Sequence, residues 1–184
     1  MFRNVEAFLR YFEGVNRRAT RDIAALPAAA DGWRPATGEG EGEKAWSINQ
    51  LVGHMCGSRL YFASAYSGEG WVSPRPPDVS SREKWLPALD ASFQEFRAKI
   101  AGTPDEWLDR RVDMIDTDAT LPGWRVLLMM MEHDIHHRSQ IDTYAGINGW
   151  DVPDIYNRSA ETIGGLQAQE RKKHGLEGEG NPLV

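Results

Sequence analysis

Residues 126–144, VLLMMMEHDIHHRSQIDTY, carry the strongest evidence for the fold predicted for this chain. One stripe of side chains recurs within it at intervals of three or four residues: Val126, Met130, His133, His137, Gln140 and Tyr144. Residues three or four apart share one face of an α-helix. The stripe therefore predicts a helix that begins at Pro122, ends near Gly146 and carries two histidines on its inner face.

Three earlier segments show the same helical periodicity. Apolar residues recur three or four apart over residues 2–26, 48–62 and 86–100. Ser47 and Gln50 stand in the S-x-x-Q relation of a capping box, so the second helix is expected to begin there and to run to about Tyr66. A further short helix is expected from about Ile155 to Lys173.

The start of the third helix is left open by its residues. Ser80 or Ser81 could cap it, but Pro87 lacks a backbone donor. Either the helix starts later than the serines suggest, or its first turn is kinked. Residues 102–121 are rich in Asp, Thr and Pro and indicate a long connection, with a stretch around Val112 that could be extended.

These segments predict an all-α fold, a four-helix bundle with long connections and a short extra C-terminal helix. A chain of 184 residues is long enough for one domain with a real core, so residues 1–184 are expected to form a single domain. The glycine- and glutamate-rich loop of about residues 36–45 is expected to be flexible and solvated, and residues 175–184 to form a loose tail.

Composition narrows the classes of partner. The chain has 27 acidic and 21 basic residues, a formal net charge of −6 and a pI near 5.4, which disfavours nucleic acid and anionic membrane surfaces. Its N-terminus lacks a signal-peptide pattern, and no apolar run approaches the roughly 20 residues of a membrane span, so the chain is expected to be cytoplasmic. The single cysteine, Cys56, excludes an internal disulfide.

The two histidines of the stripe indicate a metal site. Two buried neighbouring imidazoles need a compensating partner, which a divalent metal supplies. Catalytic zinc usually has three protein ligands, and His54, at the edge of the apolar face of the second helix, is the best third donor. Cys56 points to another side of that helix and is given no role. A surface or core-lining histidine pair is the competing interpretation of H-x-x-x-H.

The neighbours of the histidines keep two interpretations each. His136 could support a ligand or lie on the surface, and Gln140 could hydrogen-bond a ligating imidazole or line the core. Glu132 and Asp134 could hold a ligand in place or be ordinary exposed charges.

Two segments, WSINQLVGH (Trp46 to His54) and HDIHHRSQI (His133 to Ile141), resemble the signature segments of the DinB-like metalloprotein superfamily. The resemblance covers residues 1 to about 155. It implies a DinB-like four-helix bundle that binds a divalent metal through His54, His133 and His137, and it implies a homodimer. Three imidazoles suit zinc, nickel and iron alike, so the identity of the metal stays open.

The resemblance implies less about the reaction. Some members resemble S-transferases or isomerases that use a low-molecular-weight thiol, and others resemble metal-dependent hydrolases. Hydrolysis needs a general base, and no buried carboxylate is evident on the two motif helices, which favours thiol transfer to a small-molecule substrate. The alternatives are a non-catalytic metal-binding stress-response bundle and an interaction module without metal. No catalytic residue is assigned.

Overall fold

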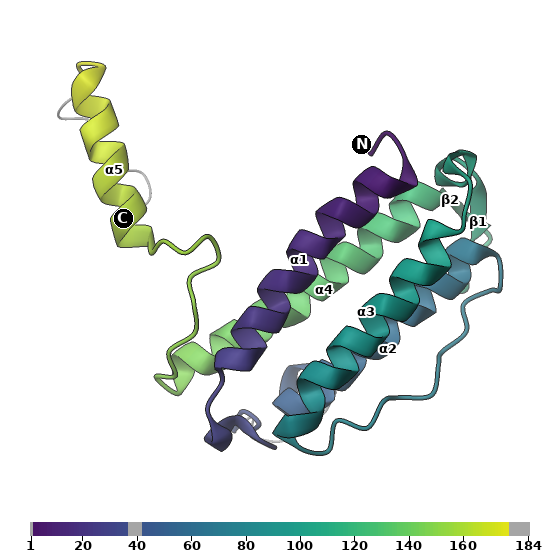
Figure 1. Cartoon of the computed structure of the whole chain (residues 1–184), viewed down its shortest axis with the longest axis horizontal. Helices are drawn as coiled ribbons and strands as arrows, with labels where there is room; N and C mark the ends of the chain where they lie inside the picture. The colour runs from purple at the N-terminus through teal and green to yellow at the C-terminus, as the bar shows by residue number, and fades with distance from the viewer. Residues whose placement is uncertain (1, 37–41, 177–184) are drawn as a thin grey trace. The chain divides into compact units, whose positions relative to one another are not determined.

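The structure is a computed structural model and describes residues 2–36 and 42–176. Residues 1–152 and 153–184 form two compact units. The described part of the first unit contains four long helices and one short hairpin (Figure 1): α1 (Val5–Ala25), α2 (Ile48–Ser67), α3 (Trp85–Ala101), β1 (Arg111–Asp113), β2 (Thr120–Pro122) and α4 (Gly123–Ile147). The predicted all-α bundle is confirmed.

The first two helices begin at side-chain caps. The side-chain oxygen of Asn4 accepts a hydrogen bond from the backbone N–H of Ala7 at 2.7 Å. The predicted capping box of α2 is present, because Ser47 Oγ accepts from the Gln50 N–H at 3.2 Å and Gln50 Oε1 accepts from the Ser47 N–H at 2.9 Å. This cap fixes the start of the helix that carries His54.

The third helix starts later than either serine suggested. A 3₁₀ turn, Arg82–Lys84, precedes it, and the cap position is Lys84 rather than Ser80 or Ser81. Pro87 therefore lies in the first turn of the helix, where a backbone N–H has no partner within the helix. The proline costs no intrahelical hydrogen bond, and this resolves the alternative that the sequence left open.

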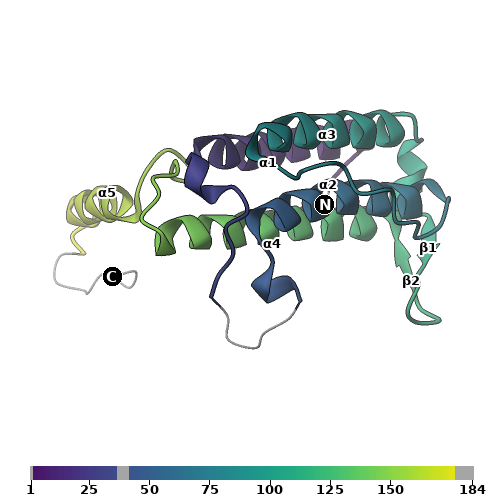
Figure 2. The ribbon, with the colours of Figure 1, turned by 90° about the horizontal axis from the view of Figure 1, so that it is seen from below.

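The connection of residues 102–121 contains the first strand of a hairpin (Figure 2). Strands β1 and β2 are antiparallel, with Val112 opposite Leu121. Gly123 follows β2 directly, and a Cβ at this position would overlap the carbonyl oxygen of Trp107. Only glycine permits this close approach, which sets the point where α4 begins.

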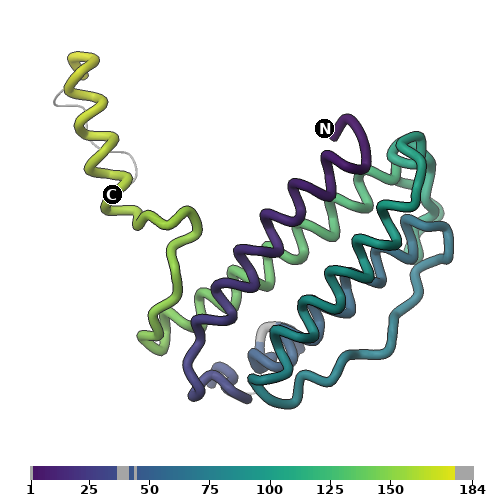
Figure 3. The backbone as a smooth tube through the Cα atoms, viewed as in Figure 1, coloured from purple at the N-terminus to yellow at the C-terminus, as the bar shows by residue number. Residues whose placement is uncertain are grey.

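Each of the four helices packs mainly against two of the others. α1 and α2 each pack against both α3 and α4 (Figure 3). Aromatic rings fill one half of the core, where Phe12 and Phe96 meet edge to face with centroids 5.1 Å apart. Since α2 and α4 are neighbours, histidines on their facing sides can meet.

The second unit contains α5 (Ala160–Lys173), the predicted extra helix, which begins at Ala160 rather than near Ile155. The Ser159 side chain caps it by accepting from the Thr162 N–H at 3.2 Å. Basic residues occupy its last turn, and none of its residues is buried.

Two sequence-based expectations fall partly outside the described residues. Of the predicted flexible loop, residues 37–41 lie outside them, and Glu43–Ala45 forms a 3₁₀ turn. Of the predicted tail, residues 177–184 lie outside them. That residues 1–184 form one domain stays a prediction. Across residues 2–36 and 42–176, no helix combines the length and the apolar character that crossing a bilayer requires.

Candidate metal centre

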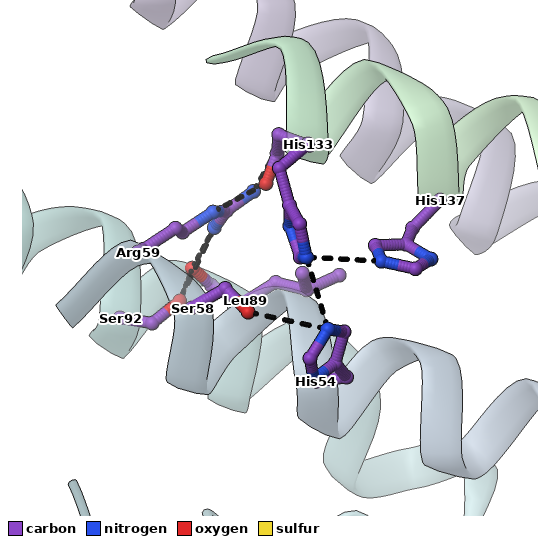
Figure 4. A network of polar contacts seen from close by, with 8 residues as sticks. His54, Ser58, Arg59, Leu89, Ser92, His133 and His137 are labelled. Carbon is purple, nitrogen blue, oxygen red and sulfur yellow. Dashed lines mark hydrogen bonds and ion pairs between the residues drawn. The ribbon is translucent and has the colours of Figure 1, made fainter. Parts of the chain in front are cut away.

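Three histidines from two neighbouring helices meet at one point. His54 extends from α2, and His133 and His137 extend from successive turns of α4 (Figure 4). The Nε2 atom of His133 lies 2.9 Å from that of His54 and 3.1 Å from that of His137. The structure thus brings together the three residues that the sequence singled out. His137 is fully buried, as expected, whereas His133 and His54 are half-buried because they line a pocket.

Gln140 fixes which nitrogen of His137 carries the proton. Its amide nitrogen donates to the backbone carbonyl of Glu43 at 3.0 Å, and its Oε1 lies 3.1 Å from Nδ1 of His137. Because Oε1 can only accept, Nδ1 carries the hydrogen and Nε2 presents a lone pair toward the other two rings. Of the two interpretations of Gln140, the hydrogen bond to the imidazole is the one observed.

The three-nitrogen cluster fits a divalent ion better than it fits hydrogen bonds alone. The Nε2 of His133 has two close nitrogen neighbours, yet a ring nitrogen either donates one hydrogen or accepts one. Three nitrogens bound to one tetrahedral zinc at about 2.0–2.1 Å stand roughly 3.3 Å apart, so small shifts would admit the ion. One cation would satisfy all three lone pairs together.

Burial keeps the three rings in the neutral state that binds metal. Burial, and then the charge on the neighbouring histidines, lowers the pKa of His133 to about 3. Burial is also the main cause that lowers the pKa of His54 and of His137. Imidazole binds a metal only when it is deprotonated, so these shifts reduce the competition from protons at neutral pH.

Aromatic rings hold the imidazoles in place. Trp46 contacts His54 edge to face at 4.8 Å between centroids and lies nearly parallel to His137 at 6.5 Å. Phe62 lies 5.9 Å from His133. Trp46, which stands just before the α2 cap, and Phe62, two turns beyond His54, therefore flank the cluster.

A family model described as the DinB family matches residues 1–171. The chain belongs to the DinB family. The curated protein YjoA of Bacillus subtilis strain 168, described as uncharacterized, is 31% identical over 104 residues, which span 55% of this chain and 67% of YjoA.

Two solved DinB-like structures share the fold. The crystal structure of YjoA from Bacillus subtilis has a TM-score of 0.61 at 19% identity, and the match covers 80% of this chain and 96% of that one. A DinB-like protein from Bacillus cereus has a TM-score of 0.62 at 16% identity, with 84% and 99% covered. The bundle of this DinB-family chain thus matches theirs over most of its length.

Sequence reasoning missed a buried ion pair beside the histidines of this DinB bundle. Arg59 on α2 donates from Nε and Nη2 to the two carboxylate oxygens of Asp134 on α4, at 2.9 and 3.2 Å, and both side chains are almost fully buried. Its Nη1 also donates to the Leu89 carbonyl and to Ser92 Oγ on α3. Asp134 is therefore neither a partner of a ligand nor an exposed charge.

The expectation of no buried carboxylate on the motif helices was wrong, because Asp134 lies on α4. Both of its oxygens accept from Arg59, so it is occupied as an ion-pair partner. A signal was present: Arg59 stands four residues after Met55 and three before Phe62, on the apolar stripe of α2. A charge at such a position indicates a buried partner.

A second buried ion pair joins α4 to α1. Arg138 donates from Nε to Asp22 Oδ2 at 2.6 Å, and the Asp22 side chain is fully buried. Asp22 falls three residues after Ala19 on the buried stripe of α1. Together, the two ion pairs connect α4 to α1 and to α2, and the bonds from Arg59 to Leu89 and Ser92 connect α3 to the same network.

Glu43 and His136 form a pair on the outer side of the centre. Glu43 Oε1 lies 3.2 Å from Nε2 of His136, and a carboxylate oxygen of Glu43 lies within 4.8 Å of a ring nitrogen of His137. The sequence suggested that the acidic run ending at Glu43 is simply solvated. His136 is exposed, which agrees with its surface interpretation.

Cys56 takes no part in the cluster. It is buried, and burial raises the pKa of its thiol. This placement agrees with the sequence analysis, which gave it no role.

Proposed function

We propose that this DinB-family chain binds a divalent transition metal, zinc, nickel or iron, through His54, His133 and His137. The observation that supports the proposal is the convergence of three Nε2 atoms, two of the contacts being 2.9 and 3.1 Å long. Burial keeps the three rings neutral, and the Gln140 hydrogen bond leaves Nε2 of His137 unprotonated and facing the other two rings. Such a set of donors is the arrangement that a catalytic metal site with three protein ligands requires.

We propose further that the chain is an enzyme that transfers a small-molecule thiol. A divalent ion lowers the pKa of a thiol or water that it binds and so supplies a nucleophile near neutral pH. The residues of the chain position the donors: Gln140 orients His137, and Trp46 packs against His54. In the transfer, a sulfur–carbon bond forms as a carbon–chlorine bond of a chlorinated substrate breaks, chloride leaves, and the thiol proton passes to solvent.

One observation favours hydrolysis as a second candidate. The carboxylate of Glu43 is close enough to His54 and His137 to oppose part of the lowering of their pKa by burial, and it is half-exposed. A carboxylate at the edge of a metal site can act as the general base that a hydrolase needs. Glu43 is thus a candidate general base that lies outside the two motif helices.

A substrate panel separates the two reactions. Protein loaded with zinc, nickel or iron is incubated either with a chlorinated aromatic electrophile and glutathione, bacillithiol or mycothiol, or with an ester and no thiol. We expect metal-dependent conjugate formation that Glu43→Gln changes less than about threefold, whereas a hydrolase using Glu43 as base would lose about 100-fold in ester turnover.

The same panel tests the non-catalytic alternative. Metal bound at one equivalent without turnover of any thiol or ester combination would contradict the enzymatic proposal and favour a stress-response bundle whose ion holds α2 and α4 together.

A further inference from the structure

A pocket opens beside two of the three histidines. It has a volume of about 710 Å³, and His54 and His133 form part of its wall. Pockets that bind small molecules typically measure about 300–1,000 Å³. The pocket is therefore large enough for a substrate that reaches the candidate metal centre.

The walls of the pocket are mainly apolar. The rings of Trp46, Tyr61 and Phe62 form an aromatic side, and prolines of the segment between α2 and α3 also line the pocket: Pro74, Pro76 and Pro77. The aromatic side is rigid, because Trp71 packs on Tyr61 and Phe62 with centroids 5.2 and 5.7 Å away. The pocket thus presents a fixed slot for a flat or aliphatic group.

Apart from the histidines of the candidate centre, the described residues of the pocket wall offer no charged side chain that could neutralise a charged substrate. Among the described residues that line it, none is Lys, Arg, Asp or Glu. Burial and the nearby Asp116 raise the pKa of Tyr61, so its phenol also stays neutral. Away from the candidate metal centre, a charged group that entered would lose hydration without gaining a side-chain counterion. An uncharged apolar group instead gains about 25 cal/mol for each Å² removed from water.

One polar group of the pocket wall, the hydroxyl of Ser58, lies next to the histidines. Ser58 Oγ lies 3.5 Å from Nε2 of His54, one helical turn further along α2. A single polar group of a substrate could therefore be held at this end while the rest of the molecule contacts the rings.

Two glycines shape the floor of the pocket. Gly53 lets the segment between α2 and α3 lie close to α2, because a Cβ at this position would stand 2.9 Å from Val79 Cγ2. Gly57 is different, because a Cβ at this position would meet no heavy atom within 4 Å. Gly57 is three residues after His54 and four before Tyr61, so a larger side chain there would enter the pocket without displacing its walls.

We propose that this pocket binds an uncharged aromatic or aliphatic substrate, with one polar group directed at His54 and His133. The inference rests on the proposed function, because it assigns the pocket to the substrate of the candidate metal centre. It narrows that function, because it makes the electrophile of the transfer reaction an uncharged apolar molecule.

The experiment compares three probes of nearly the same size and different charge: benzyl alcohol, benzylamine and phenylacetate. Their dissociation constants are measured by NMR titration of the full chain, as purified and after chelator treatment, which removes direct ligation of a metal by the charged probes. We expect benzyl alcohol to bind at least about tenfold more tightly than either charged probe in the chelated sample. Equal or tighter binding of a charged probe, or no binding of benzyl alcohol, would overturn the proposal.

Variants at helical glycines locate the binding. Gly57→Leu is expected to weaken benzyl alcohol binding at least about tenfold, because four carbon atoms occupy the pocket. Gly146→Leu is the matched control, since this glycine of α4 also has free space and lies outside the pocket, and it is expected to bind as the wild type does. Unchanged binding in Gly57→Leu would overturn the assignment. Metal content is measured on the same samples, so a failure to bind metal is distinguished from a failure to bind the probe.

Discussion

Asp134→Ala is expected to lower the free energy of unfolding by about 3–5 kcal/mol, because it leaves the guanidinium of Arg59 buried without its partner. Arg59 is only 1% exposed and otherwise contacts the Leu89 carbonyl and Ser92 Oγ, which cannot neutralise its charge. The measurement is urea denaturation followed by circular dichroism, with the two-state midpoint and slope compared with those of the wild type.

Glu132→Ala provides the matched control on the same helix. Its carboxylate pairs with Arg125 at 2.9 Å, but the side chain is 54% exposed, so its loss is expected to cost less than about 1 kcal/mol. The double variant Arg59→Met, Asp134→Leu removes both charges and is expected to be more stable than Asp134→Ala. Equal small losses in Asp134→Ala and Glu132→Ala would contradict this account of the ion pair.

Zinc is expected to raise the free energy of unfolding of the wild type by about 4 kcal/mol at a free concentration 1,000 times its dissociation constant. His137→Ala is expected to lose most of this increment, because it removes a ligand that Gln140 holds in the binding tautomer. The measurement is the difference between denaturation with buffered zinc and with chelator, taken within each variant. This difference cancels any packing loss that the substitution itself causes.

His174→Ala is the control for zinc-linked stability. His174 is exposed in the last turn region of α5, where it lies 3.3 Å from Glu170. It is expected to keep the full zinc increment. A His137→Ala protein that gains as much from zinc as the wild type does would show that the ion binds elsewhere.

Spacing within single helices was enough to predict much of the fold and the histidine cluster. The intervals between Met130, His133, His137 and Gln140 depend only on helical geometry, so they predicted which side chains share a face. The Ser47–Gln50 box is equally local, and it fixed the start of α2. His54 could be chosen as the third ligand because it lies at the edge of the apolar face of the second predicted helix.

Contacts between distant segments could not be read from local periodicity. Arg59 and Asp134 are 75 residues apart, and Arg138 and Asp22 are 116 apart, so nothing local indicates that either pair meets. Glu43 was missed for another reason: a run of glycine and glutamate looks solvated, and the contacts of Glu43 with Gln140 and His136 come from residues 97 and 93 positions away in the sequence.

Elemental analysis of the purified wild type beside His54→Ala measures whether the three histidines bind one metal ion. Both proteins are reconstituted with one equivalent of zinc, passed through a desalting column and measured for bound metal, with His136→Ala as a control from the exposed neighbouring position. We expect about one ion per chain in the wild type and in His136→Ala, and less than about a tenth of that in His54→Ala. Full occupancy in His54→Ala, or loss of the ion in His136→Ala alone, would contradict a centre built from His54, His133 and His137.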